Sequence, residues 1–231
     1  MSLISDMREH FSSSYTKLFG IEELGLLITK IHSTLISSGT ELERIITSSV
    51  KKKQLVQDLD KFINSTYTNK INNGTYLVTK KVLKNSKLFE GKINVDFLIF
   101  DITNEYKKCH IIELKSHSTL DTKKSYAEKL NLIQFHYMFS KKIDFNTNIF
   151  LCTFYEEDKQ SIYNNLKKNF DIGELLTGKE LTSLLGINYN SLIKIINKNQ
   201  SDNLDFVYKH FLKIFINMFG KDKLISDINN F

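Results

Sequence analysis

Two apolar stretches near the middle of the chain decide the fold: residues 93–100, Ile-Asn-Val-Asp-Phe-Leu-Ile-Phe, and residues 110–115, His-Ile-Ile-Glu-Leu-Lys. Each has the composition of a buried strand, and the polar residues between them are typical of a hairpin loop. Glu113 and Lys115 stand two positions apart, so they share one face of a strand, because side chains alternate with a period of two. In such a hairpin, Asp96 is expected to lie beside them.

Asp96, Glu113 and Lys115 together predict a metal site suited to hydrolysis of a phosphodiester. Two carboxylates can hold a hard divalent cation such as Mg²⁺. An ammonium group beside them can orient a water molecule or offset charge on a phosphate. The alternative is that these charges end strands because the chain has reached water. The apolar neighbours of Asp96, and the Ile-Ile pair before Glu113, favour the metal site over that alternative.

Length, charge and cysteine content narrow the class of protein. With 231 residues the chain can bury one sizeable core. Lys and Arg number 32 against 26 Asp and Glu, a basic excess that fits a polyanionic partner without establishing one. Cys109 and Cys152 lie in apolar runs, which indicates buried, reduced thiols and a cytoplasmic protein. No apolar run approaches the ~20 residues of a membrane span, so we expect no membrane association.

The rest of the chain predicts one α/β domain, helical over about residues 1–70, with a sheet core over about 75–155 and a helical part over about 159–231. In the first part, Thr40 is expected to begin a new helix, with Glu43 completing a capping box. In the core, residues 75–83 are predicted as a strand. Residues 148–154 form a continuous apolar run, which indicates a strand buried on both faces.

The segment after residue 120 predicts a helix with Asp121 as its N-cap. Its apolar residues follow at i, i+4, i+7 and i+11, and this stripe predicts the side that faces the core: Tyr126, Leu130, Ile133 and Tyr137. Strand, helix and strand in succession indicate a crossover to a parallel neighbour.

Asp96 followed by Glu113-Leu114-Lys115 resembles the D…(D/E)-x-K signature of the PD-(D/E)XK nuclease superfamily, particularly of type II restriction endonucleases. Three flanking segments are also similar to that family: residues 38–43, residues 116–124 and residues 176–181. Val95 stands where the proline of the motif would precede the aspartate. Asp101 is the rival for the first position, and its place five residues on puts it on the other side of the strand from Asp96.

The resemblance implies a site-specific deoxyribonuclease that cuts double-stranded DNA with Mg²⁺. It implies a central mixed sheet of about four to five strands flanked by helices, with a helical C-terminal part. Asp96, Glu113 and the Leu114 carbonyl would bind the metal. Glu43 would complete the site through water, and Lys115 would orient the attacking water or stabilise transition-state charge. A homodimer is expected, because cutting both strands of a symmetric site calls for two active sites. A structure-selective or repair nuclease with the same core is the alternative.

A second candidate feature is residues 180–195, whose pattern resembles a helix-turn-helix with Gly186 in the turn and Asn188 capping the second helix. It keeps open a third possibility, a non-catalytic DNA-binding protein, although two short helices can simply close a core. Across the chain, the candidates for nucleic-acid contact are His117, Lys123, Lys124, Lys80, Lys81, Tyr189, Asn190 and Lys194.

Overall fold

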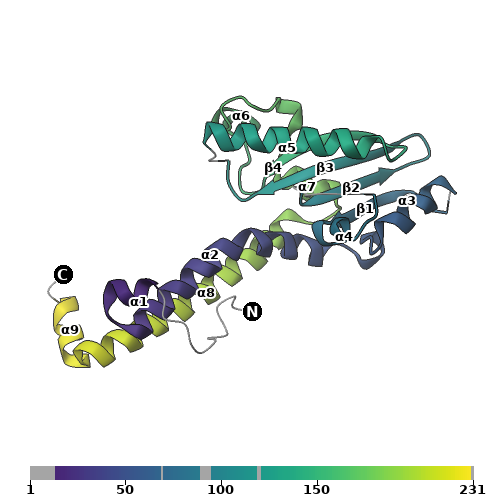
Figure 1. Ribbon diagram of the computed structural model, residues 1–231. Coiled ribbons are helices and arrows are strands. Elements are labelled where there is room, and N and C mark those ends of the chain that lie inside the picture. The colour runs from purple at the N-terminus through teal and green to yellow at the C-terminus, as the bar shows by residue number, and fades with distance from the viewer. Residues whose placement is uncertain (1–13, 69, 89–94, 119–120, 230–231) are drawn as a thin grey trace. The chain divides into compact units, whose positions relative to one another are not determined.

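The computed structural model describes residues 14–68, 70–88, 95–118 and 121–229 (Figure 1). The chain forms two compact units. One, the helical unit, comprises Met1–Thr40 with Ile193–Phe231, and the other, the sheet unit, is Glu41–Leu192. In the described ranges, no helix is both long enough and apolar enough to cross a membrane.

The sheet unit is built on a five-stranded sheet of order β1-β2-β3-β4-β5. Its strands are β1 (Gly74–Thr79), β2 (Phe97–Ile102), β3 (Lys107–Lys115), β4 (Asn146–Thr153) and β5 (Leu175–Thr177). The first three pair antiparallel, and β4 and β5 continue the sheet in parallel. This confirms the predicted mixed sheet flanked by helices, and the predicted crossover to a parallel neighbour.

Helices flank the sheet and also form the helical unit. Those of the sheet unit are α3 (Leu59–Tyr67), α4 (Lys80–Lys84), α5 (Thr122–Ser140), α6 (Lys159–Asn165) and α7 (Gly178–Leu184). Short 3-10 turns lie at Lys52–Gln54 and Ile172–Glu174. α1 (Ser14–Phe19) and α9 (Lys221–Asn229) belong to the helical unit, and α2 (Glu22–Ser49) and α8 (Tyr189–Phe219) contribute to both units.

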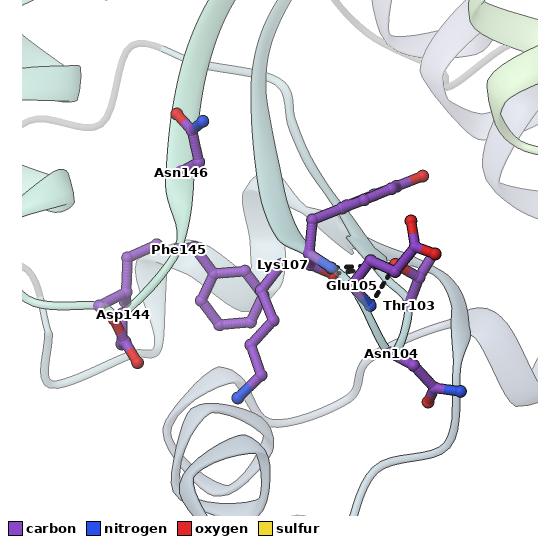
Figure 2. A pocket seen from close by; sticks show the side chains of 9 residues that line it. Thr103, Asn104, Glu105, Lys107, Asp144, Phe145 and Asn146 are labelled. Atoms are coloured by element: carbon purple, nitrogen blue, oxygen red, sulfur yellow. Dashed lines mark hydrogen bonds between the residues drawn. The ribbon is translucent and has the colours of Figure 1, made fainter.

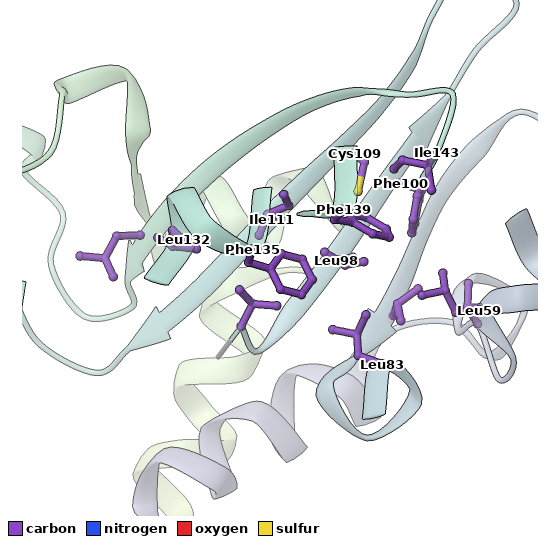
Figure 3. Close-up of a cluster of buried hydrophobic side chains, with 14 of the residues drawn as sticks. Leu59, Leu83, Leu98, Phe100, Cys109, Ile111, Leu132, Phe135, Phe139 and Ile143 are labelled. Carbon is purple, nitrogen blue, oxygen red and sulfur yellow. The ribbon is translucent and has the colours of Figure 1, made fainter. Parts of the chain in front are cut away.

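The main core of the sheet unit lies under α5, which runs along one face of the sheet (Figures 1 and 3). Leu98 and Phe100 of β2 and Ile111 of β3 are fully buried there, in one cluster with apolar side chains of α5. Each such side chain contributes roughly 1.5–3 kcal/mol by leaving water. Two free cysteines, Cys109 in β3 and Cys152 in β4, are also fully buried.

The side of α5 that faces the core is not the predicted one. The tyrosine-containing stripe is between 38% and 63% exposed. The buried side consists of Leu132, Phe135 and Phe139, which are no more than 2% exposed. Both sets have helical spacing, but leucine and phenylalanine bury apolar surface without a hydroxyl that needs a hydrogen-bond partner, whereas tyrosine keeps its polar tip in water.

Three further predictions, two on element boundaries and one on burial, differ from the structure. α2 is continuous through Thr40, because the cost of a Gly or Ser inside a helix, at most ~1 kcal/mol, is outweighed by burial of Ile45 and Ile46 in the following turns. The strand predicted over 75–83 ends at Thr79, where α4 begins. β4 is not buried along its whole length; only its last three residues are.

Gly178 predicts a large effect on stability. It follows Thr177, which forms a capping box with Glu180 at the start of α7. A Cβ on Gly178 would lie 2.1 Å from the backbone oxygen of Phe154. We expect Gly178→Ala to lower the free energy of unfolding by about 3 kcal/mol, because backbone must move to admit the methyl group. Gly173→Ala is the control, since nothing lies within 4 Å of its Cβ position. Denaturant titration should show a change of no more than ~0.5 kcal/mol for that variant.

Candidate active site

Four charged residues meet at one end of the sheet. Asp96 directly precedes β2, and Glu113 and Lys115 lie in the last three positions of β3. Lys80 is the first residue of α4, immediately after β1. The antiparallel register brings these ends together, because Phe97 is opposite both Ile112 of β3 and the last residue of β1.

Asp96 is buried and both of its carboxylate oxygens are engaged. The backbone N–H of Leu114 donates to Oδ2 at 2.9 Å, and Lys80 Nζ donates to Oδ1 at 2.8 Å. The backbone N–H of Asp96 donates to the Ile112 oxygen at 3.0 Å. These contacts fix the carboxylate alongside Glu113, in the position that the hairpin pattern predicted.

Glu113 is 6% exposed and has one oxygen to spare. Oε1 accepts a hydrogen bond from Lys115 Nζ at 2.9 Å, whereas Oε2 is buried with no hydrogen-bond partner among the described residues. Burial first, and then the negative charge of Asp96, raise the pKa of Glu113 to about 7, although Lys115 acts in the opposite direction. An acceptor left buried and unsatisfied costs free energy, so this oxygen has the capacity to bind a further group.

Lys115 is held between two carboxylates. Its Nζ lies 2.9 Å from Glu113 Oε1 and 2.7 Å from Glu128 Oε1 on α5. Burial works against the charge, but attraction to Glu113 and the hydrogen bonds with Glu128 and Glu113 outweigh it and raise the pKa of Lys115. The side chain is therefore a fixed cation at neutral pH and not a proton acceptor. The contact with Glu113 is the one that strand alternation predicted.

Glu128 is a member of this cluster that the sequence patterns did not identify. It lies four positions before Leu132, at the head of the stripe that α5 buries. A single carboxylate continuing a buried apolar stripe is the signal that would have marked it, once the buried side of α5 was known.

Glu43 approaches the same cluster from α2. It is half-buried, and burial followed by the charge of Asp96 raises its pKa to about 6, while Lys80 and Lys84 act in the opposite direction. This coupling shows that Glu43 lies within electrostatic range of Asp96. It supports the predicted grouping of Glu43 with the other carboxylates. Asp101, the rival of Asp96, lies at the other end of β2, where it accepts a hydrogen bond from the Tyr106 hydroxyl at 3.1 Å.

The donor set suits a hard divalent cation. Asp96 and Glu113 supply carboxylate oxygens, and Glu113 Oε2 has its acceptor capacity unused. In the described part of the chain, no three His, Cys, Asp or Glu side chains form a cage that could hold a metal by themselves. A cation here would therefore keep several water ligands, as Mg²⁺ usually does in proteins.

The remaining candidates for nucleic-acid contact lie outside this cluster. His117 is exposed, with its ring centroid 5.3 Å from that of Tyr155. The Tyr189 side chain is partly buried, and its hydroxyl donates to the Phe154 backbone oxygen at 3.4 Å. Asn188 caps α8 as predicted, accepting from Ser191 N–H at 3.0 Å. The other candidates are exposed: Lys81, Lys123, Lys124, Asn190 and Lys194.

A cavity of about 530 Å³ lies at the opposite end of the strands (Figure 2). It is lined by residues 103–107 of the β2–β3 turn and residues 143–146 before and at the start of β4. It shares no residue with the carboxylate cluster and belongs to a separate part of the surface.

No protein-family model matches the chain. The chain is similar to the type II restriction enzyme HhaII of Haemophilus parahaemolyticus, with 39% identity over 220 residues. The aligned region covers 93% of this chain and 95% of that protein. Identity at this level over nearly the whole of both chains reflects common descent and not a shared motif. The chain therefore belongs to the family of type II restriction enzymes.

Proposed function

We propose that this protein is a site-specific endonuclease that hydrolyses phosphodiester bonds of double-stranded DNA with Mg²⁺, using a PD-(D/E)XK active site formed by Asp96, Glu113 and Lys115. The observation that carries the proposal is the buried pair of carboxylates beside the fixed ammonium of Lys115, with Glu113 Oε2 lacking a hydrogen-bond partner in the described part of the chain. Such an arrangement is costly for the fold, which is typical of a functional site. Membership of the restriction-enzyme family supports the choice of DNA as substrate.

Each residue of the cluster has a defined task in this reaction. Asp96 is oriented by the Leu114 N–H, and Glu113 Oε2 has no hydrogen-bond partner among the described residues. These two would hold the cofactor, together with the Leu114 carbonyl. Mg²⁺, when bound, supplies Lewis-acid stabilisation of the phosphate and a water of lowered pKa. Lys115 stabilises the negative charge that develops on the phosphate and orients the attacking water. Glu43 accepts a hydrogen bond from a water at the edge of the site.

The exposed lysines and a second copy of the chain complete the proposal. Lys81, Lys123 and Lys124 are exposed, Lys124 with its Nζ 3.6 Å from Asp121 Oδ2. Each would contact a DNA backbone, where a phosphate contact releases counterions and strengthens binding. We place His117, Asn190 and Lys194 among the DNA contacts as well. Two active sites are needed to cut both strands of a symmetric sequence, so the active form is a homodimer. A DNA-binding regulator without catalysis would not need a buried carboxylate pair beside a lysine.

The proposal is tested by incubating a long duplex DNA of mixed sequence with the purified protein, in Mg²⁺ or in EDTA, and separating the products by electrophoresis. We expect discrete fragments in Mg²⁺ and intact DNA in EDTA. Asp96→Asn should slow cleavage at least about a hundredfold, because it removes a metal-binding charge. Asp101→Asn, in β2 five residues after Asp96, is the matched control and should cut at the wild-type rate.

Each other result has a definite meaning. A continuous smear of products would indicate a nuclease without site specificity. Uncut DNA with the wild-type protein in Mg²⁺ would refute the proposed reaction. Loss of cleavage in Asp101→Asn, with normal cleavage in Asp96→Asn, would move the first carboxylate of the site to the other end of β2.

A further inference from the structure

Lys80 is hydrogen-bonded to the Asp96 carboxylate, which the proposed cofactor also needs. The Leu114 N–H holds Asp96 Oδ2, so Oδ1 is the oxygen left for a metal, and Lys80 Nζ is bonded to that oxygen at 2.8 Å. The carboxylate of Asp96 is 7% exposed, whereas the Lys80 side chain is 33% exposed. The pair is thus a buried anion covered by a partly solvated cation.

The surroundings of Lys80 favour its charge only while the cluster is negative. Burial opposes the ammonium, but the hydrogen bond with Asp96 and attraction to Asp96, Glu113 and Glu43 raise its pKa. Lys84, also on α4, acts on one of these carboxylates, since it lowers the pKa of Glu43. A divalent cation among these carboxylates would replace the charge that Lys80 supplies and would repel its ammonium.

The Lys80 side chain can move into solvent when a cation displaces it. Lys80 is the first residue of α4, and its flexible four-carbon side chain is already partly in water. Lys81 beside it is exposed. Rotation about its side-chain bonds would let the Lys80 ammonium leave Asp96 for the solvent that the side chain already reaches.

We propose that Lys80 is a resident counter-ion of Asp96, that a divalent cation displaces it, and that the released ammonium then binds a phosphate of the DNA backbone. The inference rests on the proposed function and adds to it a coupling between the two ligands. Because binding linkage is reciprocal, the metal strengthens DNA binding through Lys80, and DNA strengthens metal binding to the same degree.

The first test measures Mn²⁺ binding to the DNA-free protein, from the electron paramagnetic resonance signal of the unbound ion. We compare the wild type with Lys80→Met, Lys80→Arg and Lys81→Met. Lys80→Met removes the competing cation, so it should bind Mn²⁺ about tenfold more tightly than the wild type. Lys80→Arg keeps a competing charge, and Lys81→Met leaves the cluster intact. Both should stay within about twofold of the wild type.

The second test measures DNA affinity by fluorescence anisotropy as the salt concentration varies, on a duplex that the wild type cuts. All proteins carry Lys115→Met, so that the DNA stays intact. At saturating Mn²⁺, Lys80→Met should reduce the slope of log affinity against log salt by about 0.9, the contribution of one phosphate contact. In EDTA the slope should not change, because Lys80 is then held by Asp96.

The outcomes separate this inference from the proposed function. Unchanged or weaker Mn²⁺ binding in Lys80→Met, by a protein whose wild type cuts DNA, would show that Lys80 supports the site and does not compete for it. Equal loss of slope with and without Mn²⁺ would show a phosphate contact that is independent of the metal, and would also overturn the coupling. No Mn²⁺ binding and no cleavage by the wild type would remove the proposed function, and this inference with it.

Discussion

Lys115→Met is expected to slow DNA cleavage about a thousandfold, the largest loss of activity from any single lysine of the chain. The Lys115 ammonium is held in the cluster by hydrogen bonds of 2.9 Å and 2.7 Å to Glu113 and Glu128. Methionine keeps most of the length and apolar volume of the side chain and removes only the charge. Single-turnover cleavage rates measure the effect, with Lys61→Met as the control, because that side chain lies on α3, is 85% exposed and has no proposed DNA contact.

A second variant separates the chemistry of Lys115 from its effect on the fold. Lys115→Met leaves Glu113 and Glu128 without their shared cation, and this alone should lower stability at neutral pH. Adding Glu128→Gln removes one of the two carboxylates. The double variant should regain stability in a thermal melt and remain as slow in cleavage as Lys115→Met. Recovery of the wild-type rate in the double variant would mean that Lys115 acts by neutralising Glu128 and has no direct part in the reaction.

Glu113→Gln is expected to abolish cleavage and, at the same time, to stabilise the protein at pH 8. The pKa of Glu113 is raised to about 7 from its ordinary value of 4.5. Since one unit is worth about 1.4 kcal/mol, ionised Glu113 costs the folded state on the order of 3 kcal/mol. Glutamine keeps an acceptor for Lys115 without that charge. Cleavage should fall about a thousandfold or more, because the buried oxygen available to the metal is lost.

The pH dependence of this gain follows from the sign of the shift. A carboxylate whose pKa is higher in the folded state than in the unfolded state favours folding while it is protonated. Wild-type stability from this group is therefore full below about pH 4.5 and is lost as the pH rises through about 7. Denaturant titrations without metal should show Glu113→Gln to be more stable than the wild type at pH 8 and nearly equal to it at pH 4.5. A variant that is less stable at pH 8 would contradict the assignment of Glu113 as a destabilising charge.

Much of the candidate site could be predicted because it depends on local geometry. Alternation along β3 alone requires Glu113 and Lys115 to share a face, and their 2.9 Å contact is the consequence. The position of Asp96 follows from the hairpin, whose loop fixes which residue of one strand faces which residue of the next. Four of the five strands were within reach for the same reason, since each carries its own apolar pattern. The three-residue β5 was not, because it lies in the part of the chain that was predicted to be helical.

The contacts made by Glu128 and Lys80 could not be predicted, because both depend on choices that local patterns leave open. α5 carries two stripes of identical spacing, and only packing decides that Leu132 and Phe135, with Glu128 above them, face the sheet. Lys80 begins a short run that fits strand and helix alike, because Leu83 would be buried in either. Its pairing with Asp96 appears only once β1 is seen to end at Thr79.

The two buried cysteines can report how often the central strands of the sheet separate. Cys109 and Cys152 lie in adjacent parallel strands, neither exposes its sulfur, and burial raises the pKa of both thiols. Only a thiolate that has reached solvent attacks an alkylating reagent. A reagent such as iodoacetamide therefore modifies these residues only in molecules whose central strands have separated. The rate of alkylation of the unmodified chain, followed by mass spectrometry, measures how often that separation occurs.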